Sequence, residues 1–396
     1  MQSELSTQTV LTRGVAEVLP DMNTLAKRME EGPIRLFLGI DPTGSTLTLG
    51  HSVVLRKIQQ FADLGHEVIL LIGNGTVRIG DPTGRDSTRP ELTDAQIQEN
   101  FASWKEQASL ILNFEKIEIR KNGDWLDALT YVDMVKLLSK TTVQQLIERD
   151  MFQDRIKQGL PIYGHEIMYP LLQGYDSVVM DVDLEVGGTD QTFNMMMGRS
   201  LQKQYNNREK WVLSTPIING TDGRKMSKSY GNFIALQENP RDMYGKLMSI
   251  SDDMIIEYCT VLTDMPTQEI KNFEERLQSG ENPMIFKKIL AKTITEMYHS
   301  TEEARNAEEF FEKTVQGNAI PEDAPTITIS QDTLLLDFLK KALPEESASQ
   351  LRRLIDQKAI EMLPSKERPS SPEHTVKVSD EVIRVGKRKY FKVNHV

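Results

Sequence analysis

Two short segments of this 396-residue chain carry residue types that can hold a polyphosphate. In the first, Gly50 and His51 stand where an apolar strand-like stretch, residues 34–40, has ended and a helix-like stretch, residues 50–64, begins. Free N–H groups at a helix N-terminus attract phosphate, and ligands of open α/β sheets bind beyond the carboxyl ends of strands. Gly50 lets a nucleotide ring approach the backbone, and His51 can donate to a phosphate or ribose oxygen.

The second segment reads Lys-Met-Ser-Lys-Ser over residues 225–229 and follows the last strand-like stretch of the N-terminal half. Two ammonium groups three residues apart, among small hydroxyls and flanked by Gly223 and Gly231, favour a loop that closes on a polyphosphate. Lysine acts there as a compact point charge and can stabilise charge growing on a leaving pyrophosphate. Taken alone, each segment has an ordinary alternative, namely a plain first helical turn for His51 and a solvated basic loop for the lysines.

A third set of polar residues shares one face of a predicted helix. Tyr169, Gln173 and Asp176 are spaced i, i+4, i+7, which places them on the same side of an α-helix. A hydroxyl, an amide and a carboxylate that converge on one face suit a zwitterionic ligand with a phenol group. An ordinary polar helix surface is the alternative for this trio.

Alternating strand-like and helix-like stretches must position these residues. Strands are predicted near residues 34–40, 67–73, 117–119, 185–186 and 211–214, with helical patterns between them. This alternation predicts an α/β fold with a parallel sheet and right-handed crossovers. After residue 239 the pattern becomes helical, residues 317–330 read as a linker rich in turn residues, and the last stretch is short and strand-rich.

Composition narrows the class of protein. A hydrophobic fraction of 39 % and a charged fraction of 27 % are typical of globular chains, and the length predicts two or three domains. No apolar run is long enough for a transmembrane helix and no secretory signal is visible, so a cytoplasmic protein is expected. Cys259 is the only cysteine and the six histidines are scattered, so neither an internal disulfide nor a zinc site is expected.

The charge is unevenly distributed. The whole chain carries -11, yet residues 331–396 contain 13 basic and 10 acidic residues, which gives this tail +3 and leaves -14 for the rest. A basic tail on an acidic body suggests local contact with an anionic partner. Random charge scatter is the alternative.

In combination, the glycine-histidine segment and the later Lys-Met-Ser-Lys-Ser segment resemble the class I aminoacyl-tRNA synthetases. The residues between them narrow the resemblance to the bacterial tyrosyl-tRNA synthetase family, from about residue 12 to the end. The matching runs are Arg13-Gly14-Val15, Asp41-Pro42-Thr43, residues 79–84 (Ile-Gly-Asp-Pro-Thr-Gly), residues 169–177 (Tyr-Pro-Leu-Leu-Gln-Gly-Tyr-Asp-Ser) and residues 187–191 (Gly-Gly-Thr-Asp-Gln).

The resemblance implies a Rossmann-like catalytic domain over residues 1–236, with a helical insertion at about 124–165. It further implies an α-helical domain over 237–316 that binds the anticodon stem, a linker over 317–330, and a small α+β RNA-binding module over 331–396. The implied activity is that of a tyrosine–tRNA ligase, with ATP and magnesium, L-tyrosine and tRNA-Tyr as partners. The resemblance also implies a homodimer that forms through the helices near residues 130–165. It implies no structural metal.

Residue roles follow from the same resemblance. Catalysis would involve His51, Lys225, Lys228, Thr48 and Thr43. Tyrosine would be bound by Tyr169, Gln173, Asp176, Asp81 and Gln191, with Asp176 accepting the phenolic hydrogen. ATP would contact Asp41, Gly50, His51, Gly188, Asp190, Met226 and Lys228.

Two positions depart from the family pattern. Thr48 stands where the signature usually begins with histidine, and threonine cannot carry imidazolium charge. We therefore expect a weaker contact with the phosphates there, with Arg78 as a candidate for compensation. Phe37 stands where many relatives have a tyrosine that contacts the phenolic hydroxyl, so Asp176 would bear more of the selectivity.

The C-terminal tail resembles a small RNA-binding module first seen in a ribosomal protein. Its candidate RNA contacts are Arg352, Arg353, Lys387, Arg388 and Lys389, whose cationic side chains would grip phosphates. Two alternative functions stay open at this point. One is a tryptophanyl-tRNA synthetase, which shares the architecture, and the other is a catalytically weak RNA-binding paralogue, which Thr48 makes conceivable.

Overall fold

The computed structural model describes residues 5–83, 92–316, 324–329, 332–377, 382–386 and 389–395. The chain divides into two compact units. The first comprises Met1–Glu238 and Ser249–Leu290, and the second comprises Asn239–Met248 and Ala291–Val396. Within the described ranges, no helix is both long and apolar enough to cross a membrane.

The first unit contains a six-stranded sheet in the order β1-β6-β5-β2-β3-β4. Five strands pair in parallel, as the sequence predicts: β2 (Arg35–Ile40), β3 (Glu67–Ile72), β4 (Ile117–Lys121), β5 (Leu184–Gly188) and β6 (Trp211–Thr215). The sixth, β1 (Glu17–Leu19), pairs antiparallel with β6 at the edge and is an exception to the expected parallel sheet. Its three residues are too few to give a periodic signal.

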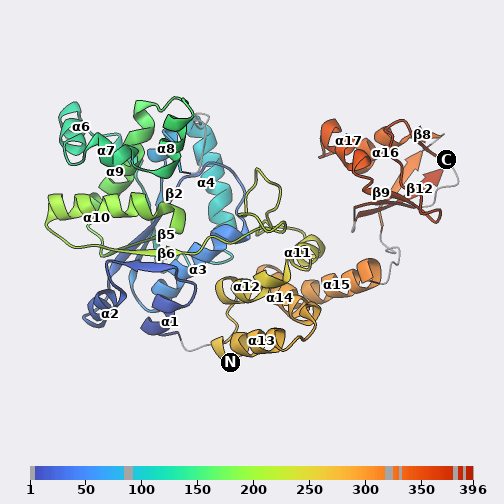
Figure 1. Cartoon of the computed structure of the whole chain (residues 1–396), viewed down its shortest axis with the longest axis horizontal. Helices are drawn as coiled ribbons and strands as arrows, with labels where there is room; N and C mark the ends of the chain where they lie inside the picture. Colours follow the sequence, from blue (N-terminus) through green and yellow to red (C-terminus); the bar gives the residue numbers. More distant parts are fainter. Residues whose placement is uncertain are drawn as a thin grey trace. The chain divides into compact units, whose positions relative to one another are not determined.

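Two crossover helices cover the two faces of this sheet. The helix α3 (Leu49–Asp63) connects β2 to β3, and α10 (Thr192–Asn206) connects β5 to β6. Right-handed crossovers that step in opposite directions along the sheet place their helices on opposite faces, and Figure 1 shows α10 and α3 on either side of the sheet. The helix α3 buries its apolar side chains, among them Val53, Leu55, Ile58 and Phe61.

The described part of the first unit contains further α-helices. Thr93 caps the N-terminus of one of them, α4, since its side chain accepts from the N–H of Gln96. These helices are α1 (Thr7–Thr12), α2 (Met22–Glu30), α4 (Asp94–Ala108), α5 (Gly123–Leu126), α6 (Tyr131–Leu138), α7 (Val143–Ile147), α8 (Asp150–Lys157), α9 (Gly164–Met180), α12 (Ile255–Leu262) and α13 (Thr267–Gln278).

The helix α12 belongs to the first unit although the sequence groups it with the helical region after residue 237. Arg13 explains this, because its guanidinium donates to the backbone oxygens of Cys259, Thr260, Thr263 and Met265. These carbonyls lie at and beyond the C-terminal end of α12, where the backbone oxygens have no partner within the helix. The bonds therefore fasten α12 to the N-terminal segment of the chain.

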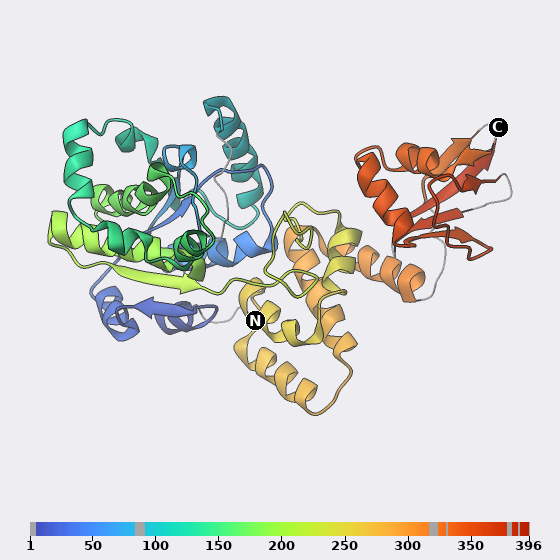
Figure 2. The ribbon, with the colours of Figure 1, turned by 45° about the horizontal axis from the view of Figure 1, so that its top comes forward.

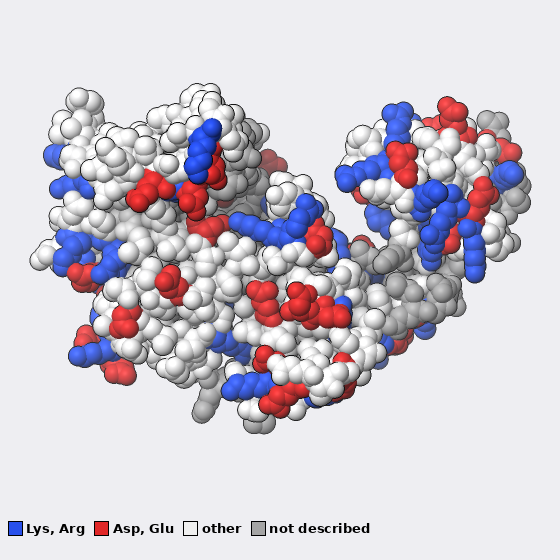
Figure 3. All heavy atoms as spheres, in the orientation of Figure 1, with Lys and Arg blue, Asp and Glu red and all other residues white. Residues whose placement is uncertain are grey.

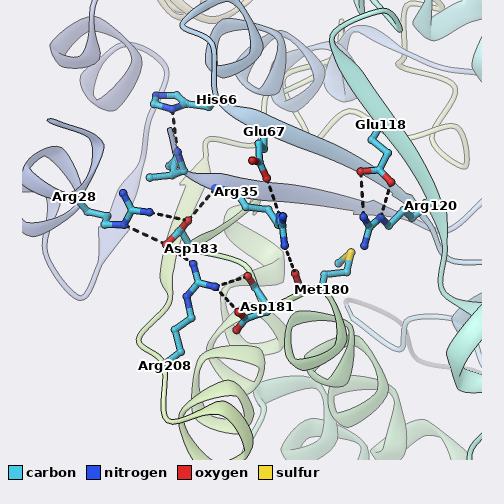
Figure 4. A network of polar contacts seen from close by, with 11 residues as sticks. Arg28, Arg35, His66, Glu67, Glu118, Arg120, Met180, Asp181, Asp183 and Arg208 are labelled. Carbon is cyan, nitrogen blue, oxygen red and sulfur yellow. Dashed lines mark hydrogen bonds and ion pairs between the residues drawn. The ribbon is translucent and has the colours of Figure 1, made fainter. Parts of the chain in front are cut away.

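At the amino ends of the strands, charged side chains form a network (Figure 4). Asp183 lies at its centre, is 4 % exposed, and receives hydrogen bonds from Arg28, from Arg208 and from the backbone N–H of Arg35. On neighbouring strands, Arg35 also forms an ion pair with Glu67 at 2.9 Å. The network joins α2, the strands β2 and β3, the loop before β5 and the loop after α10.

The second unit combines helices with a small sheet. Its helices are α11 (Pro240–Leu247), α15 (Thr301–Phe311), α16 (Leu335–Ala342) and α17 (Ala348–Asp356), and α14 (Pro283–Tyr298) runs from the first unit into the second. The sheet has the order β7-β12-β11-β9, made of β7 (Thr326–Ile329), β9 (Ile360–Leu363), β11 (Val382–Val385) and β12 (Lys389–His395). A separate pair joins β8 (Thr333–Leu334) to β10 (Thr375–Val376). Figure 2 shows α16 and α17 against this sheet.

Strand β7 corrects the expected linker at residues 317–330. Its residues 326–329 pair in parallel with β12, and Ile329 is 1 % exposed in the core beneath α16 and α17. The edge of the sheet gives this segment its backbone hydrogen bonds. Of the expected linker, residues 317–323 and 330 lie outside the described residues.

Candidate active site

A cavity of about 580 Å³ opens at the carboxyl ends of β2 and β5, between the N-terminus of α3 and one face of α9. Its lining contains most of the residues that the sequence singles out: Asp41, Thr43, His51, Asp81, Tyr169, Gln173, Asp176, Gly188, Gln191, Lys225, Met226 and Lys228. The three segments identified from the sequence therefore meet at a single site, as the topology of a parallel sheet requires.

The helix α9 contributes Tyr169, Gln173 and Asp176 to the wall. The Tyr169 hydroxyl donates to Oδ2 of Asp41 at 2.9 Å, and the Gln173 amide donates to Oε1 of Glu185 at 3.0 Å. The three side chains lie on one helical face, as their spacing predicts. The Tyr169 hydroxyl and one hydrogen of the Gln173 amide are thus bonded within the protein, and the amide oxygen of Gln173 keeps lone pairs for a ligand.

Asp176 is the most buried of the three, with 2 % of its surface exposed. Its carboxyl accepts from the indole Nε1 of Trp125 at 2.8 Å and from the Asn122 amide at 3.2 Å. Burial raises the pKa of Asp176 well above its usual range, and the two hydrogen bonds oppose that rise. A buried carboxyl held by neutral donors is suited to form a strong hydrogen bond with a phenol.

Two further aspartates lie on the wall near Tyr169. Asp41 accepts from the Thr76 hydroxyl at 2.7 Å, and Asp81 accepts from the Gln191 amide at 2.8 Å. Gly73 makes room for Asp41, because a Cβ at that position would lie 2.0 Å from its Oδ1. These carboxylates can attract the ammonium group of an amino acid.

The imidazole of His51 faces the cavity in a defined tautomer. Its Nδ1 lies 3.1 Å from the backbone nitrogen of Thr48 and 2.8 Å from the Thr48 hydroxyl. A backbone N–H is always a donor, so Nδ1 accepts and the ring hydrogen is on Nε2. Burial, with the nearby charge of Lys228, lowers the pKa of His51 to about 4. His51 is therefore a neutral hydrogen-bond donor near pH 7.

The Lys-Met-Ser-Lys-Ser loop supplies the cations at the cavity. Lys225 pairs with Asp190 at 3.0 Å, and the ammonium of Lys228 lies 3.3 Å from the position of a Cβ on Gly44. The pKa of Lys228 is lowered because its side chain is partly withdrawn from water. Two lysines beside a helix N-terminus can attract the negative charge of a polyphosphate.

Comparison with known proteins shows which family this chain belongs to. The family profile described as tRNA synthetases class I (W and Y) matches residues 29–316. The tyrosine–tRNA ligase of Thermotoga maritima is 44 % identical over 97 % of this chain and 96 % of its own length, and that of Aquifex aeolicus is 40 % identical over 97 % of both. This chain belongs to the tyrosyl-tRNA synthetases.

Solved structures of lower identity share the fold of this tyrosyl-tRNA synthetase. The enzyme of Archaeoglobus fulgidus, complexed with L-tyrosine, has a TM-score of 0.61 at 21 % identity and covers 76 % of this chain and 98 % of its own. A mitochondrial enzyme of Coccidioides posadasii, truncated at its C-terminus, has a TM-score of 0.62 at 21 % identity, over 78 % and 92 % of the two chains.

Some residues expected in the site of a tyrosyl-tRNA synthetase do not line the cavity. Thr48 is 4 % exposed and bonds to His51 instead. Gly50 packs behind the loop, where its Cβ position is 3.6 Å from the Met226 sulfur. Asp190 lines a neighbouring cavity of about 650 Å³. Arg78 is occupied by ion pairs with Asp127 at 2.7 Å and Asp94 at 3.4 Å, so the compensation that we considered for it has no support.

Other residues of the site are missed by sequence reasoning. Asn122 follows β4 directly. Because ligands bind beyond the carboxyl ends of strands, this position in the sequence could have indicated a site residue. Trp125 donates to Asp176 and Thr76 donates to Asp41, and no local sequence pattern reveals either contact. Lys210 is fully buried behind the cavity and bonds to Glu185, which lies in the cavity wall. Phe37, which the sequence does single out, is fully buried in a cluster that includes Ile69 and Met180, and it is not among the residues that line the cavity.

The RNA contacts expected in the C-terminal module are partly described. Arg352 and Arg353 are exposed on α17, and Lys389 is exposed at the start of β12. Lys387 and Arg388 lie outside the described residues.

Proposed function

We propose that this chain activates L-tyrosine with ATP and then transfers tyrosine to the 3'-terminal adenosine of tRNA-Tyr. In the first step a carboxylate oxygen of tyrosine attacks the α-phosphorus of ATP, and pyrophosphate leaves. In the second step a ribose hydroxyl of the tRNA attacks the tyrosyl carbonyl carbon, and AMP leaves. The observation that carries the proposal is the cavity itself, which has the buried carboxyl of Asp176 in one wall and the lysine loop in another.

Asp176 is the group that we assign to the phenol. Its two protein partners occupy only part of its acceptor capacity. Tyr169, Gln173 and Asp81 then receive the ammonium group, whose three hydrogens match three acceptors. An enzyme built around a substrate hydroxyl discriminates strongly against the analogue without it, because a buried partner is left unpaired. The rejection of phenylalanine by tyrosyl-tRNA synthetases is the standard example of this effect, and the same reasoning disfavours tryptophan.

The other side of the cavity is assigned to ATP. His51 donates from Nε2 to a phosphate oxygen, while Lys225 and Lys228 stabilise charge that grows on pyrophosphate. Thr43, Asp41, Gly188 and Met226 lie in the same wall. No group of three or more acidic, histidine or cysteine side chains suited to a metal occurs in the described part of the chain, so magnesium would be held by phosphate oxygens and water. Catalysis then rests on positioning and charge stabilisation.

Exchange of labelled pyrophosphate into ATP tests the proposal. Tyrosine should support exchange, whereas tryptophan and phenylalanine at equal concentration should not. Exchange with tryptophan would favour the tryptophanyl alternative. If none of the three amino acids supports exchange, a catalytically weak RNA-binding paralogue is favoured.

The helical region over residues 237–316 and the C-terminal module over residues 331–396 are assigned to tRNA binding, and the protein is assigned to the cytoplasm. We assign the helical region to the anticodon stem and the C-terminal module to RNA phosphates. Figure 3 shows Lys and Arg side chains on the face of this module that is in view, with acidic ones among them. Charge reversal at Arg352 and Arg353, both exposed on α17, should slow tRNA charging and leave pyrophosphate exchange unchanged.

A homodimer through the helices near residues 130–165 is part of the proposal. Its support is a group of exposed apolar side chains on α6 and α7, where Tyr131 is 83 %, Val132 55 %, Val135 48 % and Val143 59 % exposed. The surface over these helices is largely uncharged in Figure 3. Contiguous exposed apolar patches mark association sites. Sedimentation of a Val135→Glu variant should show monomers if this face forms the dimer.

A further inference from the structure

Behind the cavity, a lysine and a glutamate form a buried ion pair. Lys210 immediately precedes β6 and is 0 % exposed, and Glu185 in β5 is 1 % exposed. The ammonium of Lys210 bonds to Oε2 of Glu185, to the Ser177 hydroxyl at 2.7 Å and to the backbone oxygen of Met195 at 3.1 Å. All three donor hydrogens of the ammonium are thus used.

The space for this ammonium is created by a glycine. A Cβ on Gly198 of α10 would lie 2.5 Å from the Lys210 nitrogen and 2.7 Å from the Ser177 oxygen. Burying a charged pair costs free energy that its own attraction offsets only with good geometry. Stability alone therefore does not explain why the fold makes room for this buried ion pair.

The reason is found on the other oxygen of Glu185. Its Oε1 accepts from Nε2 of Gln173 at 3.0 Å, and both side chains line the cavity. An ionised carboxylate can only accept hydrogen bonds, so it fixes the Gln173 amide with its NH2 group toward Glu185 and its carbonyl oxygen Oε1 the other way. No described residue donates a hydrogen bond to that oxygen, which leaves it available to the cavity.

We propose that Glu185 and Lys210 are positioning residues for the amino end of the substrate. Lys210 pairs with one carboxylate oxygen of Glu185, the other oxygen of Glu185 holds the Gln173 amide in one orientation, and Gln173 then presents an acceptor rather than donors to the ammonium of tyrosine. Without the pair the amide is free to flip, and its NH2 group then meets the ammonium. The inference rests on the proposed function, since it assumes that the amino group of tyrosine lies beside Gln173.

The test compares three variants with the unsubstituted enzyme. Lys210→Met removes the ammonium, and the double variant Glu185→Gln with Lys210→Met removes both charges, so that no unpaired charge remains buried. Lys57→Met is the matched control. Lys57 is 3 % exposed and donates to the backbone oxygens of Val10 and Arg13 and to the Gln60 side chain, and it does not line the cavity.

Two readouts separate positioning from folding. The first is pyrophosphate exchange, in which the KM for tyrosine should rise about tenfold in the Lys210→Met and double variants, while kcat and the KM for ATP stay within about twofold. The second is inhibition by desaminotyrosine, which has the phenol and the carboxylate but no ammonium. Its inhibition constant should be the same in all four proteins. Lys57→Met should lower the unfolding temperature and leave both readouts unchanged.

Each result decides a different question. If the unsubstituted enzyme shows no tyrosine-dependent exchange, the proposed function fails. If it exchanges normally and the folded double variant keeps the original KM for tyrosine, the positioning role fails alone. A variant that loses tyrosine and desaminotyrosine binding equally would also overturn it, because the amino end would then not be the group affected. Should Lys210→Met not fold, the double variant carries the same comparison.

Discussion

The two ends of the first unit's sheet both bury an aspartate, and they satisfy it with different partners. At the amino ends of the strands, Asp183 is 4 % exposed and bonds to the guanidinium groups of Arg28 and Arg208 (Figure 4). At the carboxyl ends, Asp176 is 2 % exposed, and its hydrogen-bond donors are the neutral amide of Asn122 and the neutral indole of Trp125.

This difference separates stability from function. A carboxylate between two guanidinium groups has its charge compensated within the fold, so nothing remains for a ligand to pair with. A carboxyl held by neutral donors is fixed in place without compensation, and burial then raises its pKa. The residues at the carboxyl ends of the strands therefore contribute less to the stability of the fold and are better able to bind a ligand, which is typical of functional sites.

The largest effect is expected at Asp176. Asp176→Asn keeps the size of the side chain and removes its charge, so kcat/KM for tyrosine activation should fall about a thousandfold. The free energy of unfolding at neutral pH should rise rather than fall in this variant. The raised pKa means that the folded state binds the proton more tightly than the unfolded state. The charged form therefore lowers the free energy of unfolding at neutral pH, and this cost disappears as the pH falls toward 4.

The unfolding temperature of Asp176→Asn should thus equal or exceed that of the unsubstituted protein at pH 7, with the difference shrinking on acidification. Thermal unfolding at several pH values, together with pyrophosphate exchange, measures both. A variant that loses stability and activity together would contradict the proposed separation.

Asp183→Asn is the counterpart at the amino end. The substitution leaves two guanidinium groups without their shared carboxylate, so the free energy of unfolding should fall by about 2–3 kcal/mol. Because Asp183 lies at the opposite end of the strands from the cavity, kcat/KM should change by less than about twofold. Urea unfolding measures the free energy of unfolding, and pyrophosphate exchange at urea concentrations below the unfolding transition measures kcat/KM. A large loss of kcat in folded protein would break the comparison.

The two ends also share a histidine arrangement, which permits a matched pair of variants. His51 accepts at Nδ1 from the N–H of Thr48, and His66 accepts at Nδ1 from the N–H of Ile34 at 3.3 Å. His51→Ala should lower kcat about a hundredfold, as expected when one donor to a developing charge is lost. His66→Ala should leave kcat unchanged.

The pH dependence sharpens this prediction. Since the pKa of His51 is about 4, its imidazole is neutral in the folded protein at pH 6 and above. The ratio of rates between the unsubstituted enzyme and His51→Ala should therefore be constant from about pH 6 to 8. A ratio that falls as the pH rises through 6.5 would show that the imidazolium acts instead.

The sequence predicts those features whose causes are local. The apolar strands β2 and β3 and the face of α9 that carries Tyr169 and Asp176 all follow from periodicity over a few residues. Strand β7, Thr-Ile-Thr-Ile, does alternate in the manner of a strand, but it is only four residues long and follows a segment rich in turn residues. Its pairing partner β12 lies some sixty residues later, so the sequence around β7 does not show where it pairs.

The site shows the same limit. Residues that touch a ligand are revealed by motifs, whereas their supports are placed by tertiary contacts. Lys210 precedes an apolar strand and reads as a surface lysine, yet the fold buries it completely against Glu185. Thr48 stands in a motif position associated with phosphate contact, and only the structure shows that it is turned toward His51. Pairing across the fold cannot be inferred from either local pattern.

The smallest effect is expected from Thr48, and it decides between two roles. If its hydroxyl touched phosphate, Thr48→Val would cost about a hundredfold in kcat. In this structure the hydroxyl supports Nδ1 of His51, and the backbone N–H of the same residue does so as well. Valine keeps the N–H, so the tautomer of His51 is preserved and kcat should fall only about two- to fivefold. Thr24→Val, which removes the hydroxyl that Trp211 donates to at the amino end, is the matched control and should leave kcat unchanged.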